Sequence, residues 1–486
     1  MTKKNLTTDD VSKHNTQSDC WMTVRGIVYD VTEFLQQHPG GPQALLAYAG
    51  ADATGAYDSV HTPELLEKDA PTSIKNLGPV DPQSVAMAVD LGALKDTSSK
   101  KPPLESLINT YDFEAVAEKT SSAKAWAFFS SAATDLISMR LNKEAFDRVL
   151  LRPRVMRNNK EVDTTTTILG VRTRSPFFVA PTAMAKMIHQ DGEMAVSKGT
   201  GAEGIIHIIS TNSSAPIADI ISAGLGPEKQ THFLQLYVNT DRAKTIALLK
   251  SAREAGVKAV FVTVDAHLAG KREADERLKV DVPVKSAVSG AVSHNDKKGG
   301  GMGRLMGLYV DRTLNWEDIP WLNSVCGGLP IVLKGIQTAA DAQLALKYGV
   351  QGIVLSNHGG RSLDTSPPSI FTLLELHKVC PEVFHHLEVY IDGGIRRGTD
   401  IFKALCLGAK AVGVGRPYLY ALNYGAEGIS HLTQILNDEL ETTMRMCGVT
   451  NLSQVNPGFV NTAMIDHLVP DSTGHPYVKW RPKSMI

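Results

Sequence analysis

The sequence lacks any apolar run long enough to form a membrane-spanning helix. Crossing a bilayer takes roughly 18 to 20 consecutive apolar residues, and no stretch of the 486 residues approaches that length. The opening residues, MTKKNLTTDD, have neither a secretory apolar core nor an arginine-rich amphipathic pattern, and the final KSMI does not match the peroxisomal S-K-L signal. We expect no membrane span and, by default, a cytoplasmic location.

Cysteine and net charge are also scarce. The five cysteines are odd in number, widely separated and without a C-x-x-C spacing, which argues against a disulfide framework and against a zinc site. The 50 basic and 51 acidic residues nearly cancel, and no cluster supplies the positive field that a nucleic-acid backbone requires. We therefore expect no nucleic-acid partner.

The chain is longer than a single hydrophobic core usually supports, which predicts two domains. Between Pro79 and about Leu107 the periodic apolar pattern lapses into a segment rich in Ser and Lys with the pair Pro102-Pro103, as in a linker or hinge. We predict a small domain over residues 1–79, a linker over residues 80–108 and a larger domain over residues 109–486.

The larger domain repeats short apolar runs rich in β-branched residues, separated by stretches long enough for a helix. Eight such units predict an α/β fold, a closed (β/α)8 TIM barrel, whose active-site groups gather at the carboxyl ends of the strands. An irregular insert at roughly residues 279–307 is predicted to be a mobile loop over that face. The predicted strands are Pro176–Pro181, Ile205–Ser210, His232–Tyr237, Ala259–Asp265, Pro330–Gly335, Gly352–Asn357, Glu388–Gly393 and Ala411–Gly415.

Two histidines mark the small N-terminal domain. His38 precedes Pro39-Gly40-Gly41 between a strand signal and a helical signal, and His61 lies just outside another helix-like segment. Two imidazoles that face each other across a crevice can ligate haem iron. Each histidine alone is also typical of an ordinary turn or of a solvated loop.

The surrounding motifs resemble the cytochrome b5 family of small α+β haem domains. The matching segments are Asp19-Cys20-Trp21, Val28-Tyr29-Asp30-Val31, His38-Pro39-Gly40-Gly41 and His61. The resemblance implies haem b with His38 and His61 as axial ligands. Two strong-field histidines leave no open position on the iron, so this domain is expected to carry electrons. The apolar residues expected at the haem crevice, each of which could equally be ordinary core, are Val28, Phe34, Leu45 and Leu46.

In the barrel, a histidine and an arginine follow the sixth predicted strand on a glycine-rich loop. His358 and Arg361 suit a 2-hydroxy acid, because a guanidinium can grip the carboxylate while a neutral imidazole accepts a proton. Asp265 ends the fourth predicted strand and can orient the imidazole, and Arg272 supplies a second guanidinium. Taken alone, a buried aspartate at a strand end is about as often structural as catalytic, and an arginine in a loop usually faces solvent. Their convergence from different strands favours a catalytic site.

Other strand ends carry the pattern of a flavin site. Lys334 ends the fifth predicted strand, where a cation can stabilise negative charge on a reduced flavin. The segments Asp392–Arg396 and Gly413–Arg416 follow the last two strands, where barrels commonly bind phosphate through backbone amides. No G-x-G-x-x-G opens a Rossmann unit, so a nicotinamide dinucleotide is not the expected cofactor.

With these residues, the segment from about Tyr111 to Ile486 resembles the FMN-dependent 2-hydroxy acid oxidase and dehydrogenase family. The matching motifs are Ala180–Met184, Gln235–Val238, Thr263–Asp265, Lys334-Gly335, Ser356–Arg361, Asp392–Asp400 and Gly415–Pro417. The resemblance implies that His358 is the base and Asp265 its partner, that Arg361 and Arg272 engage the substrate carboxylate, and that Tyr237 bonds the substrate hydroxyl. The implied FMN contacts are Thr182, Ala183, Ser210, Gln235, Thr263, Lys334, Ser356, Asp392, Gly393, Gly394, Arg396, Gly415 and Arg416.

The sequence departs from the family pattern in the substrate pocket. Ala183 is expected to line this pocket as well, but it is not one of the departures. Phe128 replaces a tyrosine whose hydroxyl donates to the substrate carboxylate, a loss of about 0.5 to 1.5 kcal/mol. Asn212 and Ala269 stand where relatives carry apolar residues. Either this is drift at the rim, or the pocket takes a side chain longer or more polar than that of lactate.

The combined domains predict oxidation of an L-2-hydroxy acid, lactate or a larger or more polar analogue, to the 2-oxo acid by FMN. Electrons then pass through haem b to a cytochrome c-like acceptor. The alternatives are an oxidase that uses oxygen directly and a non-catalytic flavin or haem redox sensor. The resemblance further implies a homotetramer and admits the mitochondrial intermembrane space as the location.

Overall fold

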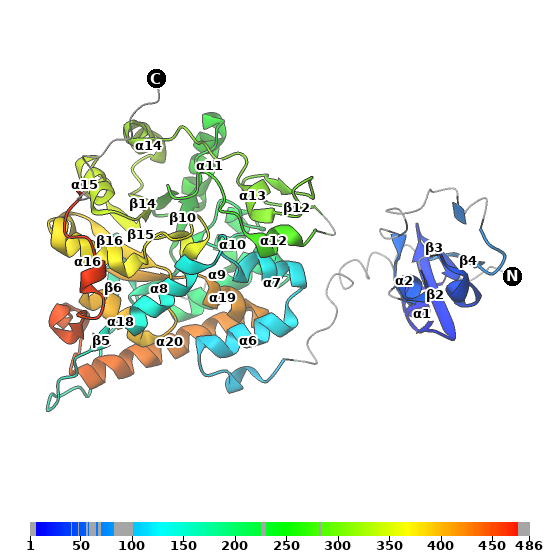
Figure 1. The fold of residues 1–486 in the computed structure, drawn as a ribbon, viewed down its shortest axis with the longest axis horizontal. Helices are drawn as coiled ribbons and strands as arrows, with labels where there is room; N and C mark the ends of the chain where they lie inside the picture. Colours follow the sequence, from blue (N-terminus) through cyan, green and yellow to red (C-terminus); the bar gives the residue numbers. More distant parts are fainter. Residues whose placement is uncertain are drawn as a thin grey trace, which may run out of the picture. The chain divides into compact units, whose positions relative to one another are not determined.

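The computed structural model describes residues 6–39, 41–46, 48–54, 57, 65–66, 70–81, 101–224, 230–280 and 283–474. The chain divides into two compact units, Met1–Lys100 and Lys101–Ile486, each with its own sheet and hydrophobic core (Figure 1). Residues 82–100, most of the predicted linker, lie outside the described residues. No helix among the described residues is both long and apolar enough to cross a membrane.

The last residues of the predicted linker contact the barrel unit. Lys101 Nζ donates a hydrogen bond to the Asn423 carbonyl at 2.6 Å, and Tyr424 Oη donates to the Pro102 carbonyl at 2.8 Å. A short 3-10 helix, Leu104–Ser106, follows at once. Residues 101–108 are therefore attached to the barrel unit.

The N-terminal unit is a four-stranded antiparallel sheet in the order β1-β2-β3-β4. A two-residue turn joins β2 to β3, and Arg25 and Gly26 both have positive φ there (51° and 76°), which matches the right-handed twist of a tight hairpin. Short helical segments join these strands, so the unit is α+β as predicted. The strands are Asn15–Thr16, Asp19–Val24, Ile27–Asp30 and Lys75–Pro79; the helical segments are α1 (Thr8–Ser12), η1 (Thr32–Gln37) and α2 (Pro42–Leu46).

Side-chain alternation separates the two faces of this sheet. Cys20 and Met22 of β2 pack with Leu35 on one face, where Leu45 and Leu46 of α2 also pack. Val28 belongs instead to a second cluster with Val11 and Val80. Neighbouring residues of a strand point to opposite faces, so the expectation that Val28 lines the same crevice as Leu45 and Leu46 was wrong.

The second unit is a closed barrel of eight parallel strands in the order β10-β11-β14-β15-β16-β17-β8-β9. Each predicted run overlaps one strand, and only β14 extends past its run, by one residue, which confirms the TIM barrel. The strands are short and buried on both faces, as expected when helices cover the outside. They are β8 (Phe177–Val179), β9 (Ile206–Ile209), β10 (His232–Leu236), β11 (Val260–Thr263), β14 (Ile331–Ile336), β15 (Gly352–Leu355), β16 (Glu388–Asp392) and β17 (Ala411–Val414).

Large side chains fill the barrel interior, and a hairpin closes its amino-terminal end. Phe261 stacks on Phe233 with ring centroids 5.6 Å apart and also faces Phe178 and Tyr390. Ile168 of the hairpin β6 (Thr166–Ile168) and β7 (Val171–Thr173) packs into the same cluster. A ligand must therefore enter from the carboxyl ends of the strands.

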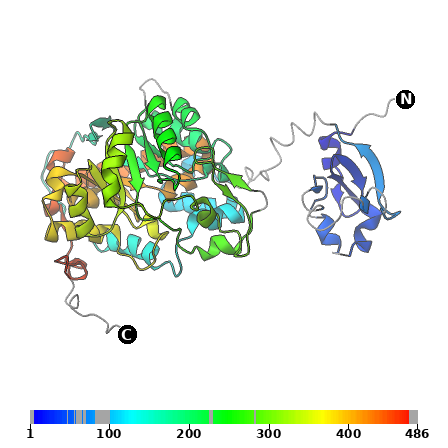
Figure 2. The same cartoon turned by 90° about the horizontal axis from the view of Figure 1, so that it is seen from above.

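Helices lie around these strands in both ribbon views (Figures 1 and 2). Glycines allow the longest helix, α20, to approach its neighbours closely: a Cβ on Gly199 would lie 2.6 Å from the Ala426 carbonyl oxygen. The helices are α6 (Thr110–Thr120), α7 (Ala123–Ser130), α8 (Ile137–Asp147), α9 (Gly192–Glu203), α10 (Ile217–Ala223), α11 (Arg242–Ala255), α12 (Glu273–Arg277), α14 (Ile319–Cys326), α15 (Ala339–Lys347), α16 (Ser369–Val379), α17 (Val383–His386), α18 (Gly398–Cys406), α19 (Arg416–Ala421) and α20 (Gly425–Cys447).

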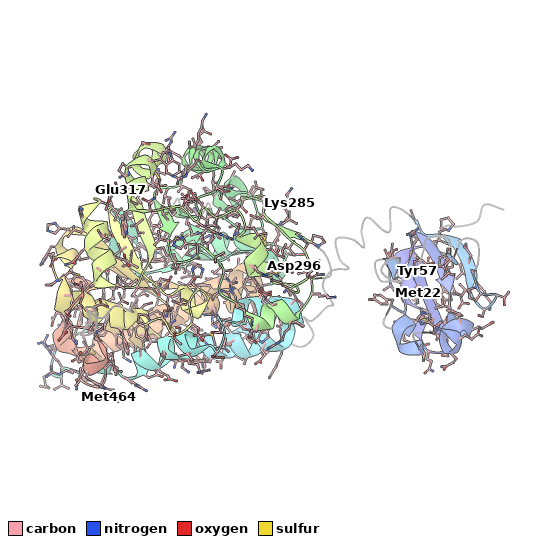
Figure 3. All side chains as sticks on the ribbon, turned by 45° about the horizontal axis from the view of Figure 1, so that its top comes forward. Met22, Tyr57, Lys285, Asp296, Glu317 and Met464 are labelled. Atoms are coloured by element: carbon pink, nitrogen blue, oxygen red, sulfur yellow. The ribbon has the colours of Figure 1, made fainter. Side chains whose placement is uncertain are left out.

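The insert at residues 279–307 differs from the irregular loop predicted. It contains β12 (Val284–Lys285), β13 (Val292–Ser293) and α13 (Met302–Met306), with residues 281 and 282 outside the described residues. Arg304 bonds to Asp296 (labelled in Figure 3) at 2.6 Å and to Glu276 at 3.2 Å. The pair with Glu276 joins the insert to α12, and the pair with Asp296 lies within the insert.

We predict that Phe261→Ala lowers the free energy of unfolding by about 3–5 kcal/mol, because the surrounding rings cannot collapse into the cavity left behind. The measurement is denaturant unfolding of the cofactor-loaded protein followed by barrel-unit fluorescence. Ile246→Ala is the control, since Ile246 is 43% exposed on α11 and its loss should cost less than about 0.5 kcal/mol. Equal losses in the two variants would contradict this packing.

Candidate active site

A cavity of about 520 Å³ opens at the carboxyl ends of the barrel strands. All but two of the predicted barrel site residues line it. The exceptions, Asp265 and Ser356, lie behind lining residues and bond to them. The predicted residues at the cavity wall are Phe128, Thr182, Ala183, Ser210, Asn212, Gln235, Tyr237, Thr263, Ala269, Arg272, Lys334, His358, Arg361, Asp392, Gly393, Gly394, Arg396, Gly415 and Arg416.

His358 and Asp265 form a hydrogen-bonded pair at the edge of this cavity. Their Nδ1 and Oδ1 atoms lie 3.0 Å apart. The Asp265 side chain is fully buried, whereas 22% of the His358 side chain is exposed. The carboxylate accepts the Nδ1 proton of a neutral imidazole, so that Nε2 carries the lone pair that can take up another proton.

The backbone of β14 next to the pair allows Asp265 to approach it closely. Gly335, which follows Lys334 at a bulge in β14, has φ +114°, and a Cβ there would lie 2.5 Å from the Asp265 Cβ. His358 itself has φ +60°, a conformation that a residue with a side chain rarely adopts. Such local strain is typical of functional sites held by their surroundings.

Two asparagines fix the His358 loop. Asn357 and Asn142 exchange reciprocal side-chain hydrogen bonds of 2.8 and 2.9 Å, and Asn357 Oδ1 also accepts from the Gly360 amide at 3.1 Å. Asn142 lies on α8, more than 200 residues earlier in the chain. Asn357 lies in the predicted motif Ser356–Arg361 but was given no role, and Asn142 was not predicted. Asn357 directly before His358 was a usable signal, whereas nothing in the sequence pointed to Asn142.

Burial and charge set the protonation of the pair. Burial lowers the pKa of His358 below its ordinary 6.5, and the Asp265 carboxylate only partly opposes this effect. Burial alone would raise the pKa of Asp265, but the charges of His358 and Lys334 outweigh it and the pKa is lowered. The site therefore holds a neutral imidazole beside an ionised carboxylate, which is the state that a general base requires.

Three arginines surround the Phe128 end of α7. Arg361 Nη1 donates to the Phe128 carbonyl at 2.7 Å, and Arg416 Nε donates to the Phe129 carbonyl at 3.0 Å. The Phe128 ring lies 5.2 Å from the Arg361 guanidinium and 5.8 Å from that of Arg272, within cation–π range. Burial, and then the neighbouring Arg272 and Arg416, lower the pKa of Arg361. Concentrated positive charge of this kind favours an anionic ligand.

Arg272 is placed by a glycine that the sequence analysis missed. A Cβ on Gly303 would lie 2.2 Å from Arg272 Nη1, so the guanidinium packs directly on the backbone of α13. Arg272 Nε is buried without a hydrogen-bond partner among the described residues. The group has donors left for a ligand carboxylate.

A buried ion pair holds the Arg272 segment against α7. Lys124 Nζ donates to Asp275 Oδ1 at 2.5 Å and also to the carbonyls of Leu278 and Gly300. Asp275 Oδ2 accepts from the Gly303 amide at 3.2 Å. One lysine therefore joins α7, α12 and the start of α13.

Other residues at the cavity wall have the donor set of a flavin site. Lys334 Nζ lies 3.1 Å from Asp392 Oδ2 and donates to Ser356 Oγ at 3.0 Å. Burial would lower the pKa of Lys334, but Asp392 and Asp265 raise it, so the ammonium remains charged. Gln235 Nε2 donates to Thr263 Oγ1 at 2.9 Å. These polar groups converge at the strand ends where the ring edge of FMN would be recognised.

The far end of the cavity fits a phosphate. Gly393 and Gly394 have φ +89° and +85°, and a Cβ on Gly394 would lie 2.2 Å from the Asn142 carbonyl oxygen. Arg396 is bonded to Glu114 and lies 4.7 Å over the Tyr111 ring. Glu114, which the sequence analysis missed, must yield to an incoming phosphate. The residues present therefore fit FMN along the whole cavity.

In the N-terminal unit, the structure describes one of the two predicted haem ligands. His38 follows η1, with its ring 5.8 Å from that of Phe34 in an edge-on arrangement, and its Nδ1 lies 3.3 Å from the Gly41 carbonyl oxygen. A bond from Nδ1–H would leave Nε2 as the metal-binding nitrogen. His61 lies outside the described residues.

Comparison with known families agrees with both sites. Residues 117–462 match the FMN-dependent dehydrogenase family, and residues 7–87 match the cytochrome b5-like haem/steroid binding domain family. The chain belongs to the FMN-dependent dehydrogenases and carries a cytochrome b5-like domain that precedes the barrel in the sequence. FMN and haem are its cofactors, and it oxidises a 2-hydroxy acid.

Individual relatives share both halves or the barrel alone. An L-lactate dehydrogenase (cytochrome) of Wickerhamomyces anomalus is 39% identical over 95% of this chain and 80% of its own length. Glycolate oxidase 3 of Arabidopsis thaliana is 38% identical over 73% of this chain and 96% of its own length. A solved structure of a mutant flavocytochrome b2 with pyruvate bound is 36% identical, with a TM-score of 0.67, and the match covers 83% of this chain and 97% of that one.

We predict that kcat/KM for flavin reduction rises with pH through a midpoint below 6.5, because the base acts when neutral and burial lowers the pKa of His358. Asp265→Asn removes a charge that raises this pKa. The midpoint should move to lower pH, and the plateau should fall by roughly 10² or more. Anaerobic rapid mixing over roughly pH 5 to 8 checks both effects. A midpoint above 6.5, or an upward shift in the variant, contradicts the assignment.

Gly303→Ala should raise KM for the substrate by roughly 10- to 100-fold, because a methyl group displaces the Arg272 guanidinium and weakens a charge-assisted bond to the carboxylate. Steady-state kinetics at saturating acceptor measure this change. Gly307→Ala is the matched control, since the described atom nearest to a Cβ there, the Gly303 carbonyl oxygen, is 3.5 Å away. Similar KM values in the two variants would show that Arg272 does not bind the carboxylate.

Proposed function

We propose that the chain oxidises an L-2-hydroxy acid, lactate or a larger or more polar analogue, and passes the electrons through its haem to a cytochrome c-like acceptor. The observation that carries the proposal is the His358–Asp265 pair, which shares one cavity with Arg272 and Arg361. A base beside two guanidiniums suits an alcohol next to a carboxylate. The printed name of the Wickerhamomyces relative supports lactate and a cytochrome acceptor.

Each pocket side chain has a task in this reaction. Arg361 and Arg272 hold the substrate carboxylate. Burial raises the pKa of Tyr237 to about 12, so its hydroxyl stays protonated and donates to the substrate hydroxyl oxygen. His358 Nε2 accepts a proton as the alcohol becomes a ketone, and Asp265 stabilises the imidazolium that forms.

The cofactors supply the electron acceptors. FMN, held at the cavity, would supply the acceptor for the electron pair of the alcohol, and the Lys334 ammonium would stabilise negative charge there. A haem iron with two histidine ligands accepts single electrons, which suits transfer to a cytochrome c-like protein. The family resemblance also supports a homotetramer, and it supports the intermembrane space of mitochondria as an alternative to the cytoplasm.

Two other functions compete with this proposal. Direct oxidation by oxygen is favoured by the similarity to a glycolate oxidase, which matches the barrel alone. The matched haem domain favours transfer through haem instead. A non-catalytic redox sensor would have no need for the intact set of His358, Asp265, Arg272, Arg361 and Lys334.

Removal of the haem ligand tests the electron route. In His38→Ala, we expect FMN reduction by L-lactate to persist while cytochrome c reduction falls by roughly 10²-fold or more, because the haem is lost. Stopped-flow absorbance records flavin, haem and cytochrome separately. His14→Ala is the matched control, because His14 bonds to Asp19 at 2.7 Å and stacks on Trp21 in the same unit. Unchanged cytochrome c reduction in His38→Ala would contradict transfer through the haem. Reoxidation of the parent's FMN by oxygen as fast as by cytochrome c would favour the oxidase.

A further inference from the structure

The side of the cavity next to β9 holds a buried amide with fixed partners. Asn212 follows β9, is only 5% exposed and lines the cavity. Its Oδ1 accepts hydrogen bonds from Ser289 Oγ at 2.6 Å and from Tyr309 Oη at 3.1 Å. Its Nδ2 donates to the Met306 carbonyl at 3.4 Å.

These neighbours determine which way the amide points. The Met306 carbonyl can only accept, so a flipped amide would set two acceptors against each other. Burial raises the pKa of Tyr309, so its hydroxyl stays protonated and able to donate. The amide oxygen is therefore occupied by two hydroxyl donors. The amide nitrogen has two hydrogens and one long bond, which leaves an N–H for a ligand.

The corner is built from three segments, and the sequence analysis found only one of its polar residues. Ser289 and Tyr309 come from the insert and the chain just after it. Ser286 Oγ ties the insert to the β9 loop by donating to the Ser213 carbonyl at 3.1 Å. Tyr237 is next to the corner, since its backbone amide donates to Thr211 Oγ1 at 3.1 Å. Tyr237 and Asn212 therefore line the same cavity from neighbouring segments.

We propose that this corner selects 2-hydroxy acids whose side chain carries a hydrogen-bond acceptor, which the Asn212 amide binds. The inference rests on the proposed function of the same cavity. Ala269 leaves room for a longer side chain, because it has no atoms beyond Cβ. A purely apolar side chain would leave the Asn212 N–H buried without a partner, whereas an ether, carbonyl or hydroxyl oxygen satisfies it.

A pair of isosteric substrates tests the proposal. 3-Methoxy-2-hydroxypropanoate differs from 2-hydroxypentanoate by an ether oxygen in place of one methylene, so it adds an acceptor and no donor. The measured quantity is the ratio of their kcat/KM values for anaerobic FMN reduction. We expect this ratio to fall roughly 10-fold in Asn212→Leu, a change of similar size that removes the amide.

Two variants that each remove one tyrosine hydroxyl distinguish a change in the orientation of the Asn212 amide from a general loss of folding. Tyr309→Phe should lower the same ratio by a smaller factor of roughly 2 to 5, because it removes one of the two donors that orient the amide. Tyr348→Phe is the matched control and should leave the ratio unchanged, since the Tyr348 hydroxyl donates to Glu317 (labelled in Figure 3). If Asn212→Leu does not fold, Tyr309→Phe against Tyr348→Phe decides the question.

The outcomes separate this inference from the function on which it rests. An equal ratio in the parent, Asn212→Leu and Tyr309→Phe, with FMN reduced by both substrates, would overturn the acceptor-binding corner and leave the proposed function intact. Failure of every 2-hydroxy acid, L-lactate included, to reduce FMN would overturn the proposed function itself. A ratio that falls in the two pocket variants alone supports the inference.

Discussion

The hydrogen bond between His358 and Asp265 is the interaction on which the active site depends. A buried carboxylate is costly unless it is paired, and Asp265 has a fully buried side chain with Oδ2 unpartnered among the described residues. The bond joins the end of β11 to the loop after β15 and sets the tautomer of the imidazole. Gly335 makes room for the aspartate, and the Asn357–Asn142 pair holds the histidine loop.

The second constraint is buried positive charge at the cavity. Arg272, Arg361 and Arg416 bond to backbone carbonyls or lie against the Phe128 ring. The carboxylate of a substrate and the phosphate of a flavin would supply counter-charge to these buried cations. The ring of Phe128 contacts two of these guanidiniums, but a tyrosine ring makes the same contacts, so nothing in the structure explains the missing hydroxyl.

Local sequence patterns predicted the barrel fold and the active-site residues at the ends of its strands. Eight apolar runs give a barrel because parallel strands buried on both faces need continuous apolar sequence, and His358 and Asp265 follow such runs directly. Contacts across the fold were not predictable. Gly303 positions Arg272, and Tyr309 orients Asn212. In each pair the two residues are far apart in the sequence, so no periodic pattern indicates that they meet. Val28 was assigned to the wrong face of its sheet because the predicted crevice rested on resemblance instead of strand alternation.

The central claim is that the His358 imidazole is the proton acceptor in 2-hydroxy acid oxidation. The most direct test is the anaerobic rate of FMN reduction by L-lactate in His358→Gln, a variant that keeps a hydrogen-bonding side chain but has no basic nitrogen. With FMN and haem content equal to the parent, this account predicts a rate lower by roughly 10² to 10⁴. A rate equal to that of the parent would contradict it.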